Sequence, residues 1–179
     1  MTTVEVVVTY LELDLVGAPV AAQPPAPSER AHRAAPLRVD RVPRADAPDV
    51  AATMYRAVGG PWHWTDRLGW SDAQWAAAID RDEVELWVAR VDHQIAGYFE
   101  LEVAGDAVEL KYFGLMPEFT GRGIGGALLS EAIARGRAIG TSRMTVNTCT
   151  LDHPAALPNY VSRGFVVVRS EPRRRSSPA

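Results

Sequence analysis

Seven segments of the chain are rich in apolar and β-branched residues, and several alternate apolar with polar positions, which is typical of strands. We predict strands at residues 3–13, 37–42, 84–91, 94–103, 107–115, 143–148 and 165–169. Tight turns at Asp92-His93 and Gly105-Asp106 join the three strands from 84 to 115, which indicates an antiparallel meander.

Helical patterns occupy most of the remaining chain. One helix begins at Pro48 or Asp49, runs to Val58 and ends at the Gly59-Gly60-Pro61 stop. Ser71 and Gln74 form a capping box for a second helix, which ends near Asp80. A third helix carries apolar residues at helical spacing (Ile124, Ala127, Leu128, Ala132) and stops at Gly140. A short fourth helix is expected near Asn159, where Pro158 requires a late start or a bend.

The order of these elements predicts an α/β fold of the α+β type. The third helix crosses from Leu115 to Met144, so the strands at its two ends are expected to be parallel neighbours. The predicted sheet is therefore mixed and mostly antiparallel, with helices on its faces. Strict alternation would place Glu109, Lys111 and Phe113 on one face of their strand, and Leu110, Tyr112 and Gly114 on the other.

A glycine-rich loop links the parallel strand to the third helix. Gly121, Gly123, Gly125 and Gly126 open that helix, and such a turn presents backbone N–H groups to phosphate. The loop lacks the Lys-Ser or Lys-Thr pair of a nucleoside-triphosphate site. A dinucleotide fingerprint fits Gly121, Gly123 and Gly126, but no strand ending in Asp or Glu follows about 20 residues later.

In two motifs the chain resembles the GNAT acetyltransferase superfamily. The segment Thr120-Gly121-Arg122-Gly123-Ile124-Gly125 lies over the family's acetyl-CoA loop, with Thr120 in place of the usual Gln or Arg. The segment from Tyr160 to Gly164-Phe165 matches the Tyr-x-x-x-Gly-Phe landmark. The resemblance covers roughly residues 37–169, and it implies a sheet in which two parallel strands splay apart.

The resemblance also implies how acetyl-CoA is bound. The backbone of Phe113 and Leu115 would pair with the pantetheine arm of the cofactor, as a neighbouring strand would. Gly114 between them is interpreted either as a bulge or as a point of close ligand approach. The remaining expected cofactor contacts are Thr120, Gly121, Arg122, Gly123, Ile124, Gly125, Gly126 and Asn159.

Acetyl transfer to an amine needs a base for the amine and a proton donor for the leaving thiolate. The resemblance suggests Glu109 as the general base and Tyr160 as the general acid. Glu109 could instead form a solvated ion pair with Lys111. Glu100 is the competing base, because a carboxylate among apolar neighbours has a raised pKa. Cys149 is interpreted as a small core residue, since direct transfer needs no acyl-enzyme.

The residues expected to contact the amine acceptor are Trp62, Trp64, Glu100 and His153. The two tryptophans lie in a loop where they could either contact the acceptor or fill the core. Trp75, on the capped helix, is expected in the core. An aromatic acceptor wall favours a hydrophobic or a cationic amine.

Composition limits the partners. Of 179 residues 47% are apolar, and the net charge of −3 gives no basic footprint for nucleic acid or anionic membrane. One cysteine and no membrane-length apolar run suggest a cytoplasmic protein, and the histidine spacing predicts no metal site. We expect an N-terminal strand region (1–16), an Ala/Pro-rich linker or wrap (17–36), one catalytic domain (37–170) and a flexible basic tail (171–179).

We therefore expect an acetyl-CoA-dependent N-acetyltransferase acting on a small-molecule amine. Two alternatives stay open, namely a protein lysine or N-terminal acetyltransferase and a non-catalytic acyl-CoA-binding sensor. The N-terminal strand could serve either function as an exposed edge for homodimerisation.

Overall fold

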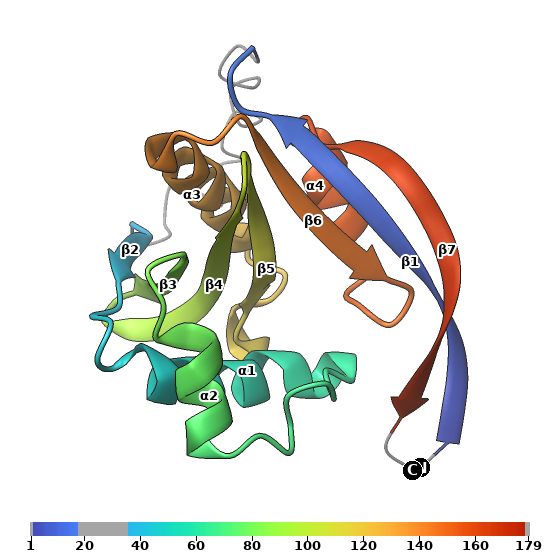
Figure 1. The fold of residues 1–179 in the computed structure, drawn as a ribbon, viewed down its shortest axis with the longest axis horizontal. Helices are drawn as coiled ribbons and strands as arrows, with labels where there is room; N and C mark the ends of the chain where they lie inside the picture. Colours follow the sequence, from blue (N-terminus) through green and yellow to red (C-terminus); the bar gives the residue numbers. More distant parts are fainter. Residues whose placement is uncertain (1, 18–35, 178–179) are drawn as a thin grey trace.

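The structure, a computed structural model, describes residues 2–17 and 36–177. Nearly all of the expected linker at 17–36 therefore lies outside the described residues. Seven strands form one sheet in the order β2-β3-β4-β5-β6-β1-β7 (Figure 1). Their bounds are β1 Thr2–Asp14, β2 Arg38–Arg41, β3 Val84–Val91, β4 Gln94–Ala104, β5 Ala107–Leu115, β6 Arg143–Cys149 and β7 Val166–Ser177.

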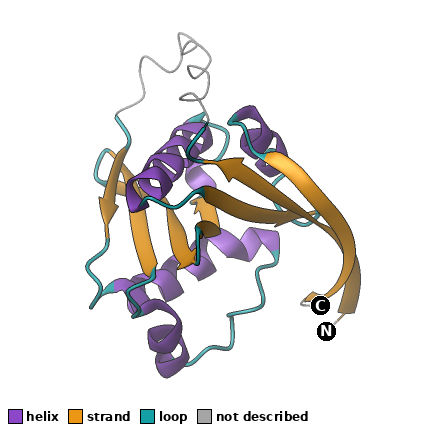
Figure 2. Cartoon of the chain, turned by 45° about the horizontal axis from the view of Figure 1, so that its top comes forward, coloured by secondary structure: helices purple, strands orange, loops and turns teal. Residues whose placement is uncertain are grey.

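Helices cover both faces of the sheet (Figure 2). They are α1 Ala47–Gly59, α2 Asp72–Ile79, α3 Ile124–Ile139 and α4 Ala156–Ser162, with short 3₁₀ turns η2 Gly60–Trp62 and η3 Pro117–Phe119. Apolar residues of α1 and α2 pack with β3 and β4 on one face, and those of α3 and α4 pack with β1, β4, β5 and β6 on the other.

Local signals placed the helix ends correctly. Ser71 accepts a hydrogen bond from the backbone N–H of Gln74, and the Gln74 side chain accepts one from the backbone of Ser71, which completes the capping box. Gly140 ends α3 in the left-handed conformation with φ +89°. Helix α4 starts late, at Ala156, so that Pro158 falls in its first turn, where no backbone donor is required.

The parallel strands β5 and β6 pair only over their first residues. Their register runs from Ala107↔Arg143 to Leu110↔Val146 and stops there, while the two strands diverge beyond it (Figure 1). The expected splayed parallel pair is present. Beyond Leu110, the edge of β5 that faces β6 is left without a strand partner.

A β-bulge lies at the point where the strands part. On β4, the neighbours Glu100 and Leu101 pair with Tyr112 and Leu110, so Lys111 is the extra residue of β5. The expected strict alternation is therefore wrong past this point. Leu110 and Phe113 both pack in the core beneath α3 and α4, whereas Tyr112 packs toward α1.

The N-terminal strand lies inside the sheet. Strand β1 pairs with β6 over Val8–Asp14 and with β7 over Thr2–Glu12, so it is not the free edge that the sequence suggested for dimerisation. Its apolar residues Leu11 and Leu13 belong to the core beneath α3 and α4.

The basic C-terminal segment is strand, not a flexible tail. Strand β7 continues to Ser177 because β1 provides backbone hydrogen-bond partners along it. The two long strands lie side by side, with Thr2 opposite Ser177 (Figure 1). The basic side chains stand in solvent or pair with acids, as Arg173 does with Glu171 at 2.5 Å. Pro172 is tolerated because β7 is an edge strand.

Candidate active site

A cavity of about 760 Å³ opens where β5 and β6 part. Its walls come from the end of β5, the glycine-rich loop, α4, the end of β6 and the segment between α1 and α2. The expected site residues that line it are Trp62, Trp64, Glu109, Phe113, Leu115, Thr120, Gly121, Gly123, Gly125, Gly126, His153, Asn159 and Tyr160. Three others do not, namely Glu100, Arg122 and Ile124.

The glycine-rich loop forms one end of the cavity. Gly121 and Gly123 both have φ +78°, a conformation that other residues rarely adopt, and no atom occupies the space where their Cβ atoms would lie. Gly123 caps the N-terminus of the sixteen-residue helix α3, whose first backbone N–H groups have no partner within the helix. This arrangement fits the phosphates of a coenzyme.

The loop residues that miss the cavity have other contacts. Ile124 is 9% exposed and packs against Phe119. The Arg122 guanidinium lies 5.1 Å from the centre of the Phe119 ring. Neither side chain lines the cavity. The loop therefore presents backbone groups to the cavity, together with Thr120 at its start.

Helix α4 is fixed against the start of α3 by polar contacts. The Asn159 side-chain amide donates to the carbonyl of Gly125 at 3.2 Å and accepts from Arg163 at 2.8 Å. A Cβ atom at Gly126 would clash with the Arg163 guanidinium. The absence of a Cβ atom at Gly126 therefore leaves room for the Arg163 guanidinium in this position.

Gly114 serves the packing of α1. An added Cβ atom would lie 2.5 Å from Cγ1 of Val58 on α1. Of the two interpretations of Gly114, the bulge is wrong, because it lies at Lys111. Val58 approaches Gly114 closely, but Gly114 also lines the cavity, so close approach by a ligand stays a prediction. Phe113 and Leu115 flank Gly114 at the cavity wall, on the stretch of β5 that has no pairing with β6.

Tyr160 lies in the wall beside this open strand edge. It is 5% exposed, and its ring packs against Phe113 and Phe165 with centroids 6.1 and 5.7 Å away. Its hydroxyl has no hydrogen-bond partner among the described residues. Burial, with a smaller contribution from Asp152, raises the pKa of the phenol above its usual value, which makes it a weaker acid than a solvated tyrosine.

The two candidate bases have different environments. Glu109 lines the cavity, and its carboxylate lies 3.5 Å from the ammonium of Lys111. Burial, the largest single influence, opposes the charge of Lys111, but the interactions with Glu102 and Glu109 together outweigh it and raise the pKa of the ammonium. The expected Glu109–Lys111 pair is present, and Glu109 keeps access to the cavity.

Glu100 is a structural residue. It is 1% exposed, and both its oxygens accept hydrogen bonds from the Arg67 guanidinium, at 2.9 and 3.0 Å. Burial raises the pKa of Glu100, as expected from its apolar neighbours, while Arg67 opposes the rise. Because both oxygens are bonded and the side chain is away from the cavity, Glu100 is not placed to act as the base.

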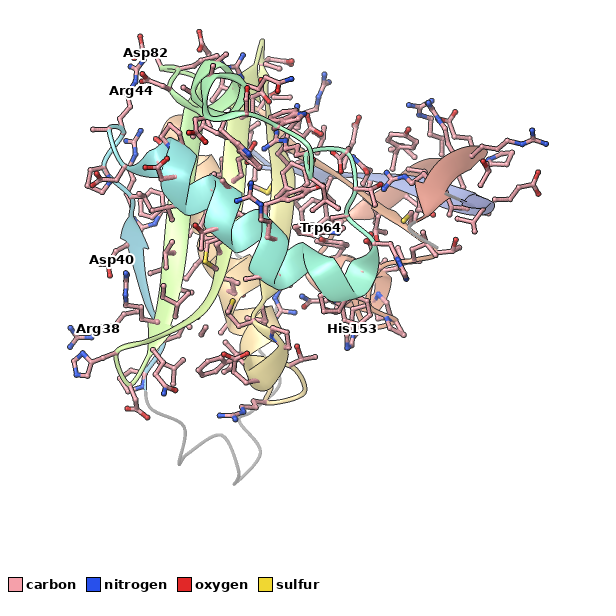
Figure 3. All side chains as sticks on the ribbon, turned by 90° about the horizontal axis from the view of Figure 1, so that it is seen from below. Arg38, Asp40, Arg44, Trp64, Asp82 and His153 are labelled. Carbon is pink, nitrogen blue, oxygen red and sulfur yellow. The ribbon has the colours of Figure 1, made fainter. Side chains whose placement is uncertain are left out.

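Aromatic and acidic side chains form the other end of the cavity. Trp64 lies between Asp152, which accepts from its indole N–H at 3.5 Å, and Tyr112, whose ring centroid is 5.1 Å away. Trp62 contacts His153 with centroids 4.9 Å apart. Figure 3 shows Trp64 and His153 at one end of α1, remote from Arg44 and Asp82. Trp75, 2% exposed, is in the core as expected.

Sequence reasoning missed several lining residues. Asp66 accepts hydrogen bonds from the phenols of Tyr55, at 2.7 Å, and Tyr112. Asp152 accepts from the Thr148 hydroxyl at 2.7 Å and the Cys149 N–H at 2.8 Å. No local pattern marks Asp66, whereas Asp152 stands directly before His153, one of the expected acceptor contacts. Other missed lining residues are Tyr112, Asn147, Cys149 and Arg175.

Two further features bear on the expected chemistry. Within residues 2–17 and 36–177, no three His, Cys, Asp or Glu side chains come close enough together to hold a metal ion. No helix in this part of the chain has the length and apolarity that a membrane crossing needs.

The sheet with its parted parallel strands, together with the glycine-rich loop, defines the fold of an acyltransferase. The chain belongs to the GNAT acetyltransferase family, whose model, described as "Acetyltransferase (GNAT) family", matches residues 51–165. Members of this family use acetyl-CoA as the acyl donor. A search of curated protein sequences found no match.

Solved structures agree with this fold. A GCN5-related N-acetyltransferase from Sphaerobacter thermophilus is 17% identical with a TM-score of 0.68, over 95% of this chain and 51% of that one. The chain thus spans about half the length of that protein. An aminoglycoside acetyltransferase from an uncultured soil metagenomic sample is 16% identical, with a TM-score of 0.60 over 72% and 87% of the chains. The ribosomal-protein-S18-alanine N-acetyltransferase of Escherichia coli is 18% identical, with a TM-score of 0.57 over 73% and 77%.

Proposed function

We propose that the protein acetylates a primary amine of a small molecule by direct attack on the thioester of acetyl-CoA. The observation that carries the proposal is the shared cavity. It extends from the glycine-rich loop, past the open edge of β5, to an aromatic and acidic pocket, and Glu109 and Tyr160 both line it. When bound, acetyl-CoA supplies an activated acetyl group.

The chain's residues would divide the work. Backbone groups of the loop and of β5 at Phe113 and Leu115 bind and orient the cofactor. Glu109 accepts a proton from the incoming ammonium, directly or through water, so that the free amine can attack. A C–N bond forms to the acetyl carbon and the C–S bond breaks. Tyr160 donates its proton to the departing thiolate, and the second proton that the attacking nitrogen loses on becoming an amide restores the phenol.

The walls of the acceptor end favour a small molecule over a protein chain. Contacts Trp64–Asp152 and Trp62–His153 join the segment between α1 and α2 to the loop between β6 and α4. These contacts bridge the two segments at the acceptor end, which supports a small acceptor. Among the similar structures, one protein is named for an aminoglycoside and another for an alanine of ribosomal protein S18, so the fold allows both kinds of acceptor.

The test is the Glu109→Gln variant, which keeps the size of the side chain and removes its basicity. We expect its kcat/KM for a small amine to fall about 10²–10⁴-fold, with acetyl-CoA affinity retained in calorimetry. Glu131→Gln is the matched control, since Glu131 lies on α3 in an exposed pair with Arg135. Unchanged turnover in Glu109→Gln would remove Glu109 from the mechanism.

A further inference from the structure

The acceptor end of the cavity carries fixed negative charge. Asp66 and Asp152 both line it; Trp64 donates to Asp152 and packs against Tyr112, whose hydroxyl is bonded to Asp66. Asp66 is held by the phenols of Tyr55 and Tyr112, and Asp152 by Thr148 and the backbone of Cys149. All of these donors are neutral groups, so none of them offsets the negative charge of either carboxylate.

Two of the nearby cations, Arg67 and Lys111, are already engaged. Arg67 lies against the Tyr112 ring at 4.3 Å, but its guanidinium is bound at both ends by buried Glu100. Lys111 is paired with Glu102 at 2.7 Å and with Glu109. A third cation, Arg175, also lines the cavity. It comes from β7, a different element from the segment between α1 and α2 that carries Asp66 and Trp64.

The aromatic rings around Asp66 are packed in a defined arrangement. Trp64 has centroids 5.5 Å from Tyr55 and 5.1 Å from Tyr112, both in tilted or edge contacts. Aromatic faces attract cations, and a carboxylate beside them adds charge-assisted hydrogen bonds. Because the hydroxyls of both tyrosines are bound to Asp66, the pocket is organised before any ligand enters.

We propose that the acceptor carries two amino groups. One, the nucleophile, reaches Glu109, and the other is bound as an ammonium by Asp66 beside Trp64. The inference rests on the proposed function and selects the cationic class over the hydrophobic one that an aromatic wall also permits. The second ammonium is unchanged by the reaction, so it sets specificity and orientation only.

The experiment compares α,ω-diaminoalkanes with monoaminoalkanes of the same chain length. For the native protein, we expect kcat/KM for the diamine to exceed that for the monoamine by about tenfold or more. In Asp66→Asn this preference should collapse, because diamine turnover falls to about that of the monoamine. Asp72→Asn, on the exposed first turn of α2, is the control and should keep the preference.

The outcomes separate the two proposals. Equal turnover of diamine and monoamine by the native protein would overturn the inference and leave the N-acetyltransferase intact. A preference that survives both Asp66→Asn and Trp64→Leu would overturn the assignment of this pocket. If neither amine is acetylated, the proposed function fails. Calorimetry of the diamine with the coenzyme A-loaded protein then decides the inference, which requires that the diamine bind more tightly than the monoamine.

Discussion

At the scale of single residues, the sequence predicted chemical character better than role. Apolar neighbours correctly indicated a raised pKa for Glu100. Its bidentate partner Arg67 is 33 positions away in the chain, and no sequence pattern predicts this pairing. Asp66 was missed for the same reason, since its phenol partners come from α1 and β5. Tyr160 was found because its segment follows a family motif.

Tyr160→Phe tests the proposed proton donor. We expect kcat to fall about 10²-fold or more, because the departing thiolate loses its proton donor. Acetyl-CoA affinity should change little, since the ring and its contacts with Phe113 and Phe165 are retained. Steady-state kinetics and calorimetry measure the two effects.

Tyr10→Phe is the matched control for this variant. It removes a phenol that is bonded to Glu171 at 3.0 Å, on β1 and away from the described cavity lining. Its kcat should equal that of the native protein. A Tyr160→Phe variant with the activity of this control would exclude Tyr160 as the proton donor.

At the scale of elements, local signals were sufficient for helices and turns. The capping box at Ser71, the stop at Gly140 and the turn at Asp92-His93, with positive φ at both residues, are each decided by a few neighbouring residues. The bulge at Lys111 is different, because it exists only relative to the β4 partner. Alternation along β5 alone could not reveal that its faces exchange there.

Gly123→Asp tests the element that would bind the phosphates. Gly123 has φ +78° at the start of α3, and the added carboxylate would lie at the helix N-terminus, where the phosphates of the cofactor are proposed to bind. We expect acetyl-CoA binding to weaken by at least about 10²-fold in calorimetry, from charge repulsion and loss of the N–H cradle together.

Gly105→Asp provides the backbone control for that experiment. Gly105 has a similar φ of +63°, lies in the turn between β4 and β5, and also has open space around its Cβ position. Its substitution adds the same strain and charge outside the cavity, so binding should be unaffected. Tight binding by Gly123→Asp, equal to that of this control, would contradict the loop assignment.

At the scale of the whole molecule, the strand order could not be read from the sequence. Strand β1 enters the sheet between β6 and β7, both more than a hundred residues later in the chain, and no local pattern specifies such pairing. The basic segment after residue 170 was predicted as a solvated tail because its composition is polar. Its position beside β1 makes it a strand instead.

Leu11→Ala tests whether β1 is an integral part of the domain. Leu11 is 1% exposed in the main core, so we expect the free energy of unfolding to fall by about 2–5 kcal/mol in urea denaturation. Val7→Ala on the same strand is the control, with 43% of the side chain exposed and an expected change below about 1 kcal/mol. Equal small effects would mean that β1 only lies along the surface.

The most direct test of the central claim is mass spectrometry of a mixed pool of amines, amino acids and short peptides, incubated with acetyl-CoA and the native protein. We predict one or a few acetylated small amines, formed with the native protein and absent with Gly123→Asp. Such a product would confirm the reaction and name the acceptor. Acetyl-CoA that binds but remains unconsumed across the whole pool would contradict it and leave an acyl-CoA-binding sensor.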